Sequence, residues 1–213
     1  MDMIKDIHWL GHDTFRIQSG GKVLYTDPFK LEGSAPDKKA DLVLITHEHY
    51  DHCSPEDVQK IAKDGTVIVC AADCVGKFPA KIKTMGVKPG DRVEVAGIGV
   101  EAVPAYNTNK KFHPREKQWV GYIFTVEGKR IYIAGDTDYI PEMRDFKADI
   151  ALLPVSGTYV MTAEEAARAA LDMKPGIVIP MHYGSIVGTR EDAARFKKIL
   201  EGKVNVAILN REG

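Results

Sequence analysis

The sequence is poor in cysteine, and this shortage excludes one class of protein. Its 213 residues include only three cysteines, Cys53, Cys70 and Cys74, and no Cys-x-x-Cys pair. Small secreted domains held together by disulfides usually carry an even number of closely spaced cysteines. We therefore expect a chain stabilised by a hydrophobic core, and its length is enough to form one.

Long apolar runs and an excess of charge of either sign are also missing. No apolar stretch approaches the roughly 20 residues of a transmembrane helix, and residues 1–9 lack the apolar segment of a signal peptide. The 29 basic and 30 acidic residues leave a formal net charge of -1, which favours neither nucleic acid nor a membrane surface as a partner. We expect a cytoplasmic protein that acts on a small molecule, and a homo-oligomer is compatible with the sequence.

Internal repeats, low-complexity tracts and linkers rich in Pro, Gly or Ser are absent, which predicts one domain over residues 1–213. Short β-type runs dominate the first half, with a hairpin turn predicted at Gly20-Gly21. In the last third, helices predicted from Thr162 and from Thr189 alternate with strands. Hairpins followed by β–α alternation in each half favour a layered α/β sandwich over an all-parallel sheet.

Four residues of metal-binding type lie directly after the predicted buried strand Leu42–Thr46. They are His47, His49, Asp51 and His52, and they include three of the seven histidines of the chain. Side chains two apart in an extended segment point the same way, so the first two histidines can share one metal. After a bend, the remaining pair can face a second position. Imidazole and carboxylate ligands suit zinc, and also manganese or iron, so a metal site is favoured over a polar surface loop.

Two later strands are predicted to deliver a metal-binding residue at their carboxyl ends. The apolar run 131–134 leads into Gly135-Asp136, and the run 177–180 leads into Met181-His182. Glycine beside such residues permits the sharp turns and close backbone approach that metal sites need. Together with the His47–His52 run, these residues predict a site assembled from separate strand ends.

These motifs resemble the metallo-β-lactamase superfamily, and within it a small single-domain branch similar to the ascorbate-6-phosphate lactonases. The resemblance extends over nearly the whole chain, and its supporting motifs are Trp9-Leu10-Gly11-His12, Tyr25-Thr26-Asp27-Pro28-Phe29, Ala134-Gly135-Asp136-Thr137, Leu152-Leu153-Pro154-Val155 and Ile179-Pro180-Met181-His182-Tyr183-Gly184. It implies a four-layer αββα sandwich with one or two metal ions, zinc or else manganese or iron, between the strand ends of the two sheets.

The resemblance also assigns roles to residues. It places His47 and His49 at the first metal and Asp51, His52 and His182 at the second, with Asp136 bridging both. Metal-bound histidines usually donate their other ring nitrogen to a carboxylate or carbonyl, a role that suits Asp27 and, less specifically, His12.

One residue departs from the family pattern. Asn107 stands about where the family has a third histidine for the first metal. Three explanations are open: the first site is weakened, Asn107 binds the metal through its amide oxygen, or His113 folds back to take the place of the missing histidine.

The resulting functional hypothesis is a hydrolase that uses a metal-activated water. Asp51 would position that water and take its proton, while Tyr183 or His113 would assist the leaving group. The substrate would be a small ester, lactone or phosphodiester, and Lys110, Lys111 and Arg115 could attract an anionic one, although a surface role suits them better. The alternative is a non-catalytic relative that binds metal or senses a ligand through a degraded first site, and Asn107 is the feature that favours it.

Overall fold

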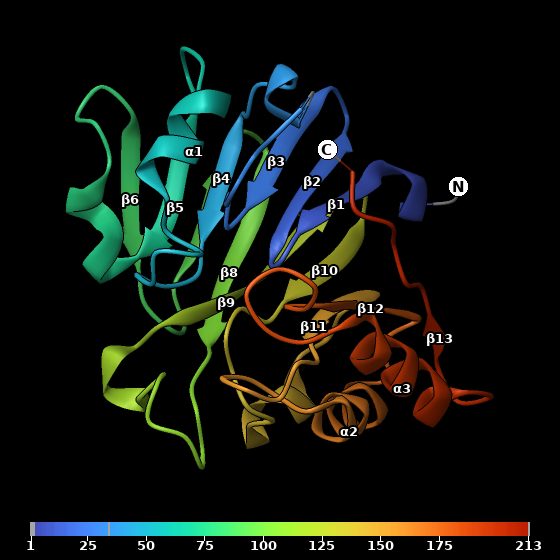
Figure 1. Ribbon diagram of the computed structural model, residues 1–213. Coiled ribbons are helices and arrows are strands. Elements are labelled where there is room, and N and C mark those ends of the chain that lie inside the picture. Colours follow the sequence, from blue (N-terminus) through green and yellow to red (C-terminus); the bar gives the residue numbers. More distant parts are fainter. Residues whose placement is uncertain (1–2, 34, 213) are drawn as a thin grey trace.

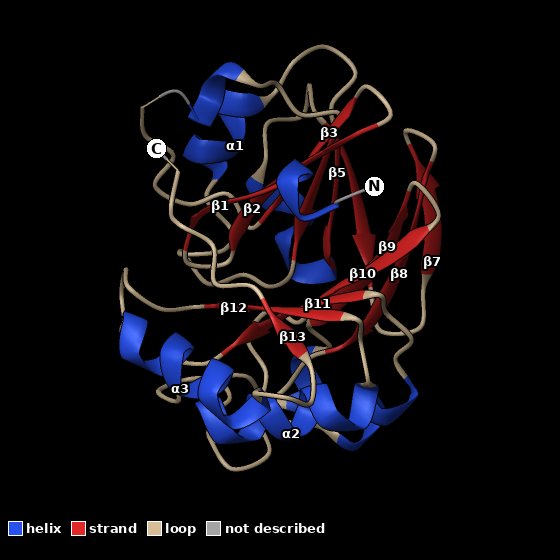
Figure 2. Ribbon diagram, turned by 90° about the vertical axis from the view of Figure 1, so that its right-hand side faces the viewer, coloured by secondary structure: helices blue, strands red, loops and turns tan. Residues whose placement is uncertain are grey.

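Two mixed β-sheets pack face to face in the computed structural model, which describes residues 3–33 and 35–212. Helix α1 (Pro55–Ile61) lies on the outer side of the first sheet, and α2 (Ala163–Met173) and α3 (Arg190–Leu200) cover the outer side of the second (Figures 1 and 2). This arrangement confirms the predicted αββα sandwich.

The first sheet contains six strands in chain order. Its first three strands form antiparallel hairpins and the rest are parallel. Gly20 and Gly21, with φ of 55° and 75°, make the predicted turn between the second and third strands. The strands are β1 (Ile7–Gly11), β2 (Thr14–Ser19), β3 (Lys22–Thr26), β4 (Leu42–Ile45), β5 (Val67–Ala71) and β6 (Lys83–Val87).

The second sheet contains seven strands in the order β13-β12-β11-β10-β9-β8-β7. Strands β10 to β13 are parallel, whereas β7 to β10 form antiparallel pairs. Hairpins therefore precede parallel strands in both halves of the chain, as the sequence predicts. The strands are β7 (Arg92–Val95), β8 (Ile98–Pro104), β9 (Val120–Val126), β10 (Lys129–Ile133), β11 (Ile150–Pro154), β12 (Ile177–Met181) and β13 (Asn205–Val206).

Three segments at the margins of the sheets differ from what the sequence favours. The short β-type runs 4–10 and 204–209 are typical of strands, but the first begins as a 3-10 helix over Met3–Asp6 and the second contains only the two-residue strand β13. Strand β6 was not predicted, because it lies at a sheet edge and most of its side chains are exposed or half-buried. Edge strands lack the two-sided packing that produces a clear apolar pattern.

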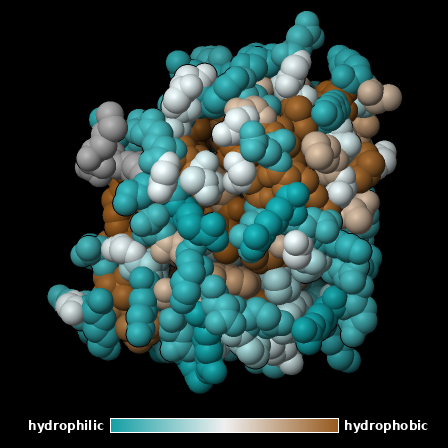
Figure 3. Space-filling model, turned by 180° about the vertical axis from the view of Figure 1, so that it is seen from behind, coloured by the Kyte–Doolittle hydropathy of each residue, from teal (hydrophilic) through white to brown (hydrophobic). Residues whose placement is uncertain are grey.

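Apolar side chains from both sheets form one continuous core cluster. Tyr122 of β9 is fully buried, and its hydroxyl donates to the carbonyl of Ile45 in the opposite sheet at 2.8 Å. On the side facing away from the view of Figure 1, apolar residues also reach the surface between hydrophilic ones (Figure 3). Among the described residues, no helix has the length and apolar character to cross a membrane.

The strand directions bring several carboxyl ends to one edge of the sandwich. In the first sheet β1, β3 and β4 run the same way, and in the second sheet β8, β10, β11 and β12 do. Backbone hydrogen bonds join the sheets there, from Val120 N to Thr46 O at 3.1 Å and from His182 N to His12 O at 3.2 Å. Residues that follow these strands are therefore close in space although they are distant in sequence.

Candidate metal centre

The first histidine group consists of His47, His49, His113 and Asp136. One nitrogen or carboxylate oxygen from each lies within 4.8 Å of the others. The Nε2 atom of His47 is 3.1 Å from Nδ1 of His49, and that Nδ1 is 3.2 Å from Nε2 of His113. Three imidazoles and a carboxylate from three different strand ends therefore surround a single point.

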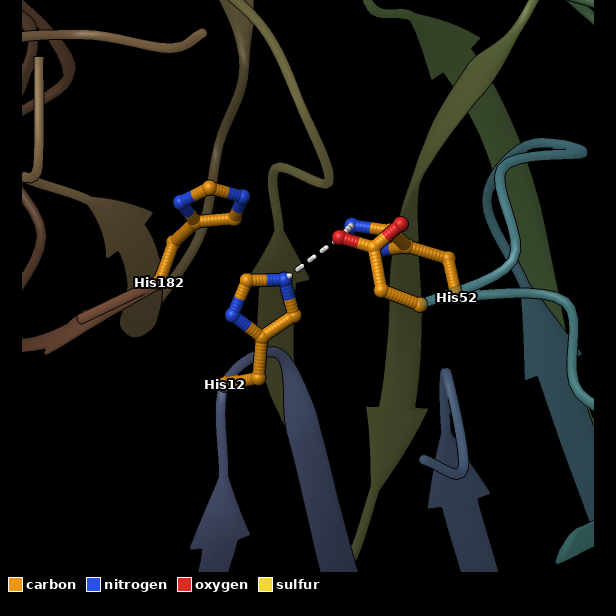
Figure 4. A group of neighbouring side chains, drawn as sticks. His12, His52 and His182 are labelled. Carbon is orange, nitrogen blue, oxygen red and sulfur yellow. Dashed lines mark hydrogen bonds and ion pairs between the residues drawn. The ribbon is translucent and has the colours of Figure 1, made fainter. Parts of the chain in front are cut away.

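The second histidine group consists of His12, Asp51, His52 and His182, whose potential ligand atoms also lie within 4.8 Å of one another. His12 extends from the end of β1, His182 from the end of β12, and His52 from the loop after β4 (Figure 4). Nε2 of His12 is 3.1 Å from Oδ2 of Asp51, the contact drawn as a dashed line. The rings of His12 and His182 have their centroids 4.1 Å apart.

Asp136 lies between the two groups and faces both of them. Its Oδ2 atom is 3.2 Å from Nε2 of His113 in the first group. Its Oδ1 atom is 3.3 Å from Nε2 of His52 and 3.2 Å from Nε2 of His182 in the second group. A carboxylate with one oxygen directed at each group has the geometry of a bridging ligand.

The polar atoms at the centre of the site fit a metal better than they fit one another. Nε2 of His52, Nε2 of His182 and Oδ1 of Asp136 are buried, and they make no hydrogen bond within the described part of the chain. Such atoms are costly unless something compensates them. Zinc bound tetrahedrally at 2.0–2.1 Å separates its ligand atoms by about 3.3 Å. The nitrogen and oxygen atoms that face each other within the two histidine groups have similar separations. The residues present therefore fit a divalent cation.

Asp27, directly after β3, orients histidines in both groups. Its Oδ2 atom accepts from His52 Nδ1 at 2.9 Å and from the Thr46 hydroxyl at 2.6 Å. The same hydroxyl is 3.0 Å from Nδ1 of His47. These contacts leave Nε2 of both histidines directed at the site, which is the arrangement typical of metal-bound imidazole.

Asn107 departs from the prediction that it binds the metal directly. Its Oδ1 atom accepts from the backbone N–H of His113 at 3.0 Å and lies 3.1 Å from that residue's Nδ1. Its amide donates to the carbonyl of Tyr159 at 2.9 Å. The amide oxygen is occupied in holding the His113 loop, so the geometry favours the third explanation, in which His113 supplies the missing imidazole.

Tyr183 also departs from its predicted role as a group that assists the leaving group. Its side chain is buried, and its ring packs on Trp9 with centroids 4.8 Å apart. By contrast, Asp51 lines a cavity at the open side of the site together with His113. Asp51 is thus in position for its predicted role, whereas Tyr183 belongs to the core.

Sequence reasoning missed two members of the site. His12 was expected to support the ligands, but it lies among them, and the buried Asp13 carboxyl beside it has no hydrogen-bond partner in the described residues. Both follow β1 in the strand-then-ligand pattern recognised at Asp136, so the pattern could have found them. His12, Asp27 and His182 have positive φ of 51°, 37° and 59°, and such backbone strain concentrates at functional sites.

Burial and neighbouring carboxylates shift the pKa values of the buried side chains in opposite directions. Burial lowers the pKa of His47 well below its ordinary value, which keeps the imidazole in the neutral form that binds metals. Burial alone would lower the pKa of His52 too, but Asp136, Asp27 and Asp13 raise it well above the ordinary value. Burial raises the pKa of Asp13 to about 7. The carboxylates around His52 therefore favour a positive charge at that imidazole, whereas burial lowers the pKa of His12 to about 4 and keeps it neutral.

Comparison with known proteins agrees with this geometry. Residues 6–182 match the family described as the beta-lactamase superfamily domain. A UPF0173 metal-dependent hydrolase of Thermoplasma acidophilum is 36% identical over 220 residues, which cover 98% of this chain and 96% of the relative.

Solved structures give the same result. A protein of Parabacteroides distasonis is 38% identical, with a TM-score of 0.85, over 96% of this chain and 93% of its own. Igni18, described as a novel metallo hydrolase from Ignicoccus hospitalis, is 27% identical, with a TM-score of 0.79, over 97% of this chain and 95% of its own. The chain therefore belongs to the UPF0173 family of metal-dependent hydrolases within the metallo-β-lactamase superfamily.

Proposed function

We propose that this metal-dependent hydrolase cleaves a small ester, lactone or phosphodiester with two divalent cations, zinc first, or else manganese or iron. The observation that carries the proposal is the position of Asp136, with one carboxylate oxygen facing each histidine group at 3.2–3.3 Å. A single ion would need only one of these groups. We assign the first histidine group to one ion and the second to the other, with Asp136 shared.

A pair of bound divalent cations lowers the pKa of a water ligand and polarises a carbonyl or phosphoryl oxygen. The chain's own contribution is to orient the reacting water. Asp51 lines the cavity, and His12 fixes its Oδ2 atom at 3.1 Å. Burial alone would raise the pKa of Asp51, but His12 and His52 lower it below the ordinary value. An ionised carboxylate at the cavity floor suits a group that orients a water and accepts its proton.

The alternative, a non-catalytic relative with a degraded first site, loses the feature that favoured it. Asn107 was that feature, and His113 supports a complete set of three imidazoles in the first histidine group. A cytoplasmic location and the oligomeric state stay predictions.

Replacing Asp136 tests the proposal. Asp136→Asn keeps the shape of the side chain but removes its charge and one acceptor oxygen. We expect the metal content to fall below two ions per chain and turnover of esters and phosphodiesters to fall by at least about 1,000-fold, since shared ligands act as a unit. Elemental analysis and steady-state kinetics measure the two effects.

Asp64→Asn is the matched control, because Asp64 is exposed in a loop away from the site. It should retain both the metal and the activity of the native chain. A full metal complement and a native rate in Asp136→Asn, measured with contaminating hydrolases excluded, would refute the assignment.

A further inference from the structure

We propose that the substrate presents an uncharged apolar group next to the bond that is cleaved, and that Tyr50, Phe112, Tyr159 and Ile186 bind this group. The inference rests on the proposed function, because it concerns the substrate class of the same site. It sets aside a substrate that carries an additional anionic substituent beside the cleaved bond, which the sequence had left open.

A cavity of about 260 Å³ opens over the metal centre. Its polar floor is formed by residues of both histidine groups, namely His49, Asp51, His113 and Asp136. Its walls are Tyr50, Phe112, Tyr159 and Ile186, and no lysine or arginine is among the described residues that line it. A group that occupies this cavity therefore lies between the polar floor and these side chains.

The aromatic walls are held in place, although they are partly exposed. The ring of Phe112 is 50% exposed and meets Tyr159 edge to face, with centroids 4.6 Å apart. Asn107 ties the two loops together, since it binds both His113 and the carbonyl of Tyr159. On the opposite wall Tyr50 is 68% exposed and contacts Phe29 at 5.8 Å between centroids. Few large apolar side chains of the described residues are this exposed, and two of them flank the cavity.

Two of the three cations that could have attracted an anion are neutralised by the chain. Lys110 forms an ion pair with the buried Asp138 at 2.5 Å. Arg115 binds Glu142 at 3.0 Å. Lys111 is exposed and does not line the cavity. The three residues that could have attracted an anion therefore offer little free positive charge at the cavity.

Burial of charge and burial of apolar surface have opposite effects in such a cavity. A charged substituent would lose water against aromatic walls without gaining a partner, which is unfavourable. An aliphatic or aromatic substituent would gain about fourfold in affinity for each methylene that becomes buried. The small volume limits this gain to a short chain or a single ring.

A matched set of esters tests the inference on the metal-loaded full chain. The para-nitrophenyl esters of acetate, butanoate and hexanoate share one leaving group, and the hemisuccinate ester adds a terminal carboxylate at nearly the length of butanoate. We expect kcat/KM to rise from acetate to hexanoate and to be at least about tenfold lower for hemisuccinate than for butanoate. Acetohydroxamate and hexanohydroxamate, whose Kd is measured by calorimetry, give a second readout that does not depend on turnover.

Two substitutions test whether Phe112 produces the preference for an apolar acyl group. Phe112→Ala should reduce the hexanoate-to-acetate ratio several-fold, and Phe112→Lys should raise relative activity on the hemisuccinate ester. Leu171→Ala is the matched control, because Leu171 is 37% exposed on α2 and does not line the cavity. It should leave every ratio unchanged.

The outcomes separate this inference from the proposed function. Absence of turnover for all esters and for bis(para-nitrophenyl) phosphate would count against the hydrolase chemistry. The Kd values of the two hydroxamates would still show whether the cavity side chains bind an apolar group. Equal kcat/KM for butanoate and hemisuccinate, equal Kd for the two hydroxamates, or ratios that do not respond to Phe112→Lys would overturn the inference and leave the hydrolase intact.

Discussion

Asn107 illustrates how a side chain can support a candidate metal ligand by hydrogen bonding to it. It occupies the position where a histidine is expected, yet it acts by holding His113 through two contacts of 3.0 and 3.1 Å. The third imidazole therefore comes from six residues further along the chain. We therefore propose that Asn107 positions His113 and is not itself a metal ligand.

We expect Asn107→Ala to weaken metal binding about 10–100-fold, the usual effect of removing a partner of a metal-bound histidine. Asn107→Asp retains an oxygen that accepts from His113, so its metal affinity should stay near that of the native chain. Competition with a chromophoric chelator measures the affinities. Equal losses in both variants would mean that Asn107 acts through packing or through its amide donation to Tyr159, and not through its oxygen.

The sequence identified most of the candidate site at the level of residues. His47, His49, His52, Asp136 and His182 could be predicted because each directly follows an apolar strand or lies in the run after one. His113 was only one of three open explanations, because its position depends on how the loop after β8 folds back. Adjacency in sequence to His182 suggested a role at the site for Tyr183, but its ring is buried against Trp9.

Among the structural elements, the junction between β10 and β4 fixes the distance between the two sheets at the site. Gly135 has φ of 62°, and a Cβ atom there would lie 2.9 Å from Cβ of Thr46. Asp136 follows directly, so the position of the bridging carboxylate depends on this close approach.

Gly135→Ala should lower the free energy of unfolding by about 2–4 kcal/mol, from a positive φ together with overpacking, and should also weaken metal binding. Gly128→Ala is the matched control, since Gly128 has φ of 74° and a Cβ atom there would meet nothing within 4 Å. It should cost only about 1–2 kcal/mol and leave the metal affinity unchanged. Urea unfolding measures both values, and equal effects of the two substitutions would contradict the role of the close approach.

Helix α1 is anchored at its first turn by the buried carboxylate of Asp57. This side chain accepts from the backbone N–H groups of Lys30 and Leu31 at 2.9 and 3.0 Å and pairs with Lys60 at 2.9 Å. Burial alone would raise the pKa of Asp57, but hydrogen bonds from Lys60, Ser54 and the two backbone groups lower it below 3.8.

Asp57→Asn should therefore lower the free energy of unfolding by about 2 kcal/mol at neutral pH. Because the pKa is lower in the folded state, the stabilisation is fully present above the unfolded pKa of about 3.9 and is lost as the pH falls through the folded value. The difference between the two proteins should shrink in that acidic range. Denaturant unfolding at several pH values measures this difference in the free energy of unfolding. Glu56→Gln is the control, because Glu56 is an exposed neighbour. A difference that is constant with pH would contradict this assignment.

Individual helices and hairpins could be predicted where turn or capping residues mark their ends. The hairpin at Gly20-Gly21 and the helix from Thr162 are present as expected, and that helix begins with a capping box of Thr162 and Glu165. Strand β6 could not be found, because its identity comes from pairing with β5 and not from its own apolar pattern.

At the scale of the whole molecule, folding and metal binding are expected to be interdependent. Nε2 of His52, Nε2 of His182 and Oδ1 of Asp136 are buried without hydrogen-bond partners within the described residues, and a bound cation would compensate them. A metal present at 100 times its Kd should stabilise the fold by about 2.7 kcal/mol for each ion. Removal of both ions by a chelator should accordingly lower the Tm by roughly 10–20 °C. Thermal unfolding with and without the chelator measures this shift in Tm. The shift should nearly disappear in Asp136→Asn. An equal shift in that variant would contradict the shared role of Asp136.

The central claim is that two cations are held between the sheet edges with Asp136 shared between them. Anomalous diffraction from crystals of the metal-loaded protein, recorded at the absorption edge of the metal, tests it most directly. We expect two peaks about 3.5–4 Å apart, one within each histidine group and both beside the Asp136 carboxylate. A single peak, or peaks away from Asp136, would contradict it.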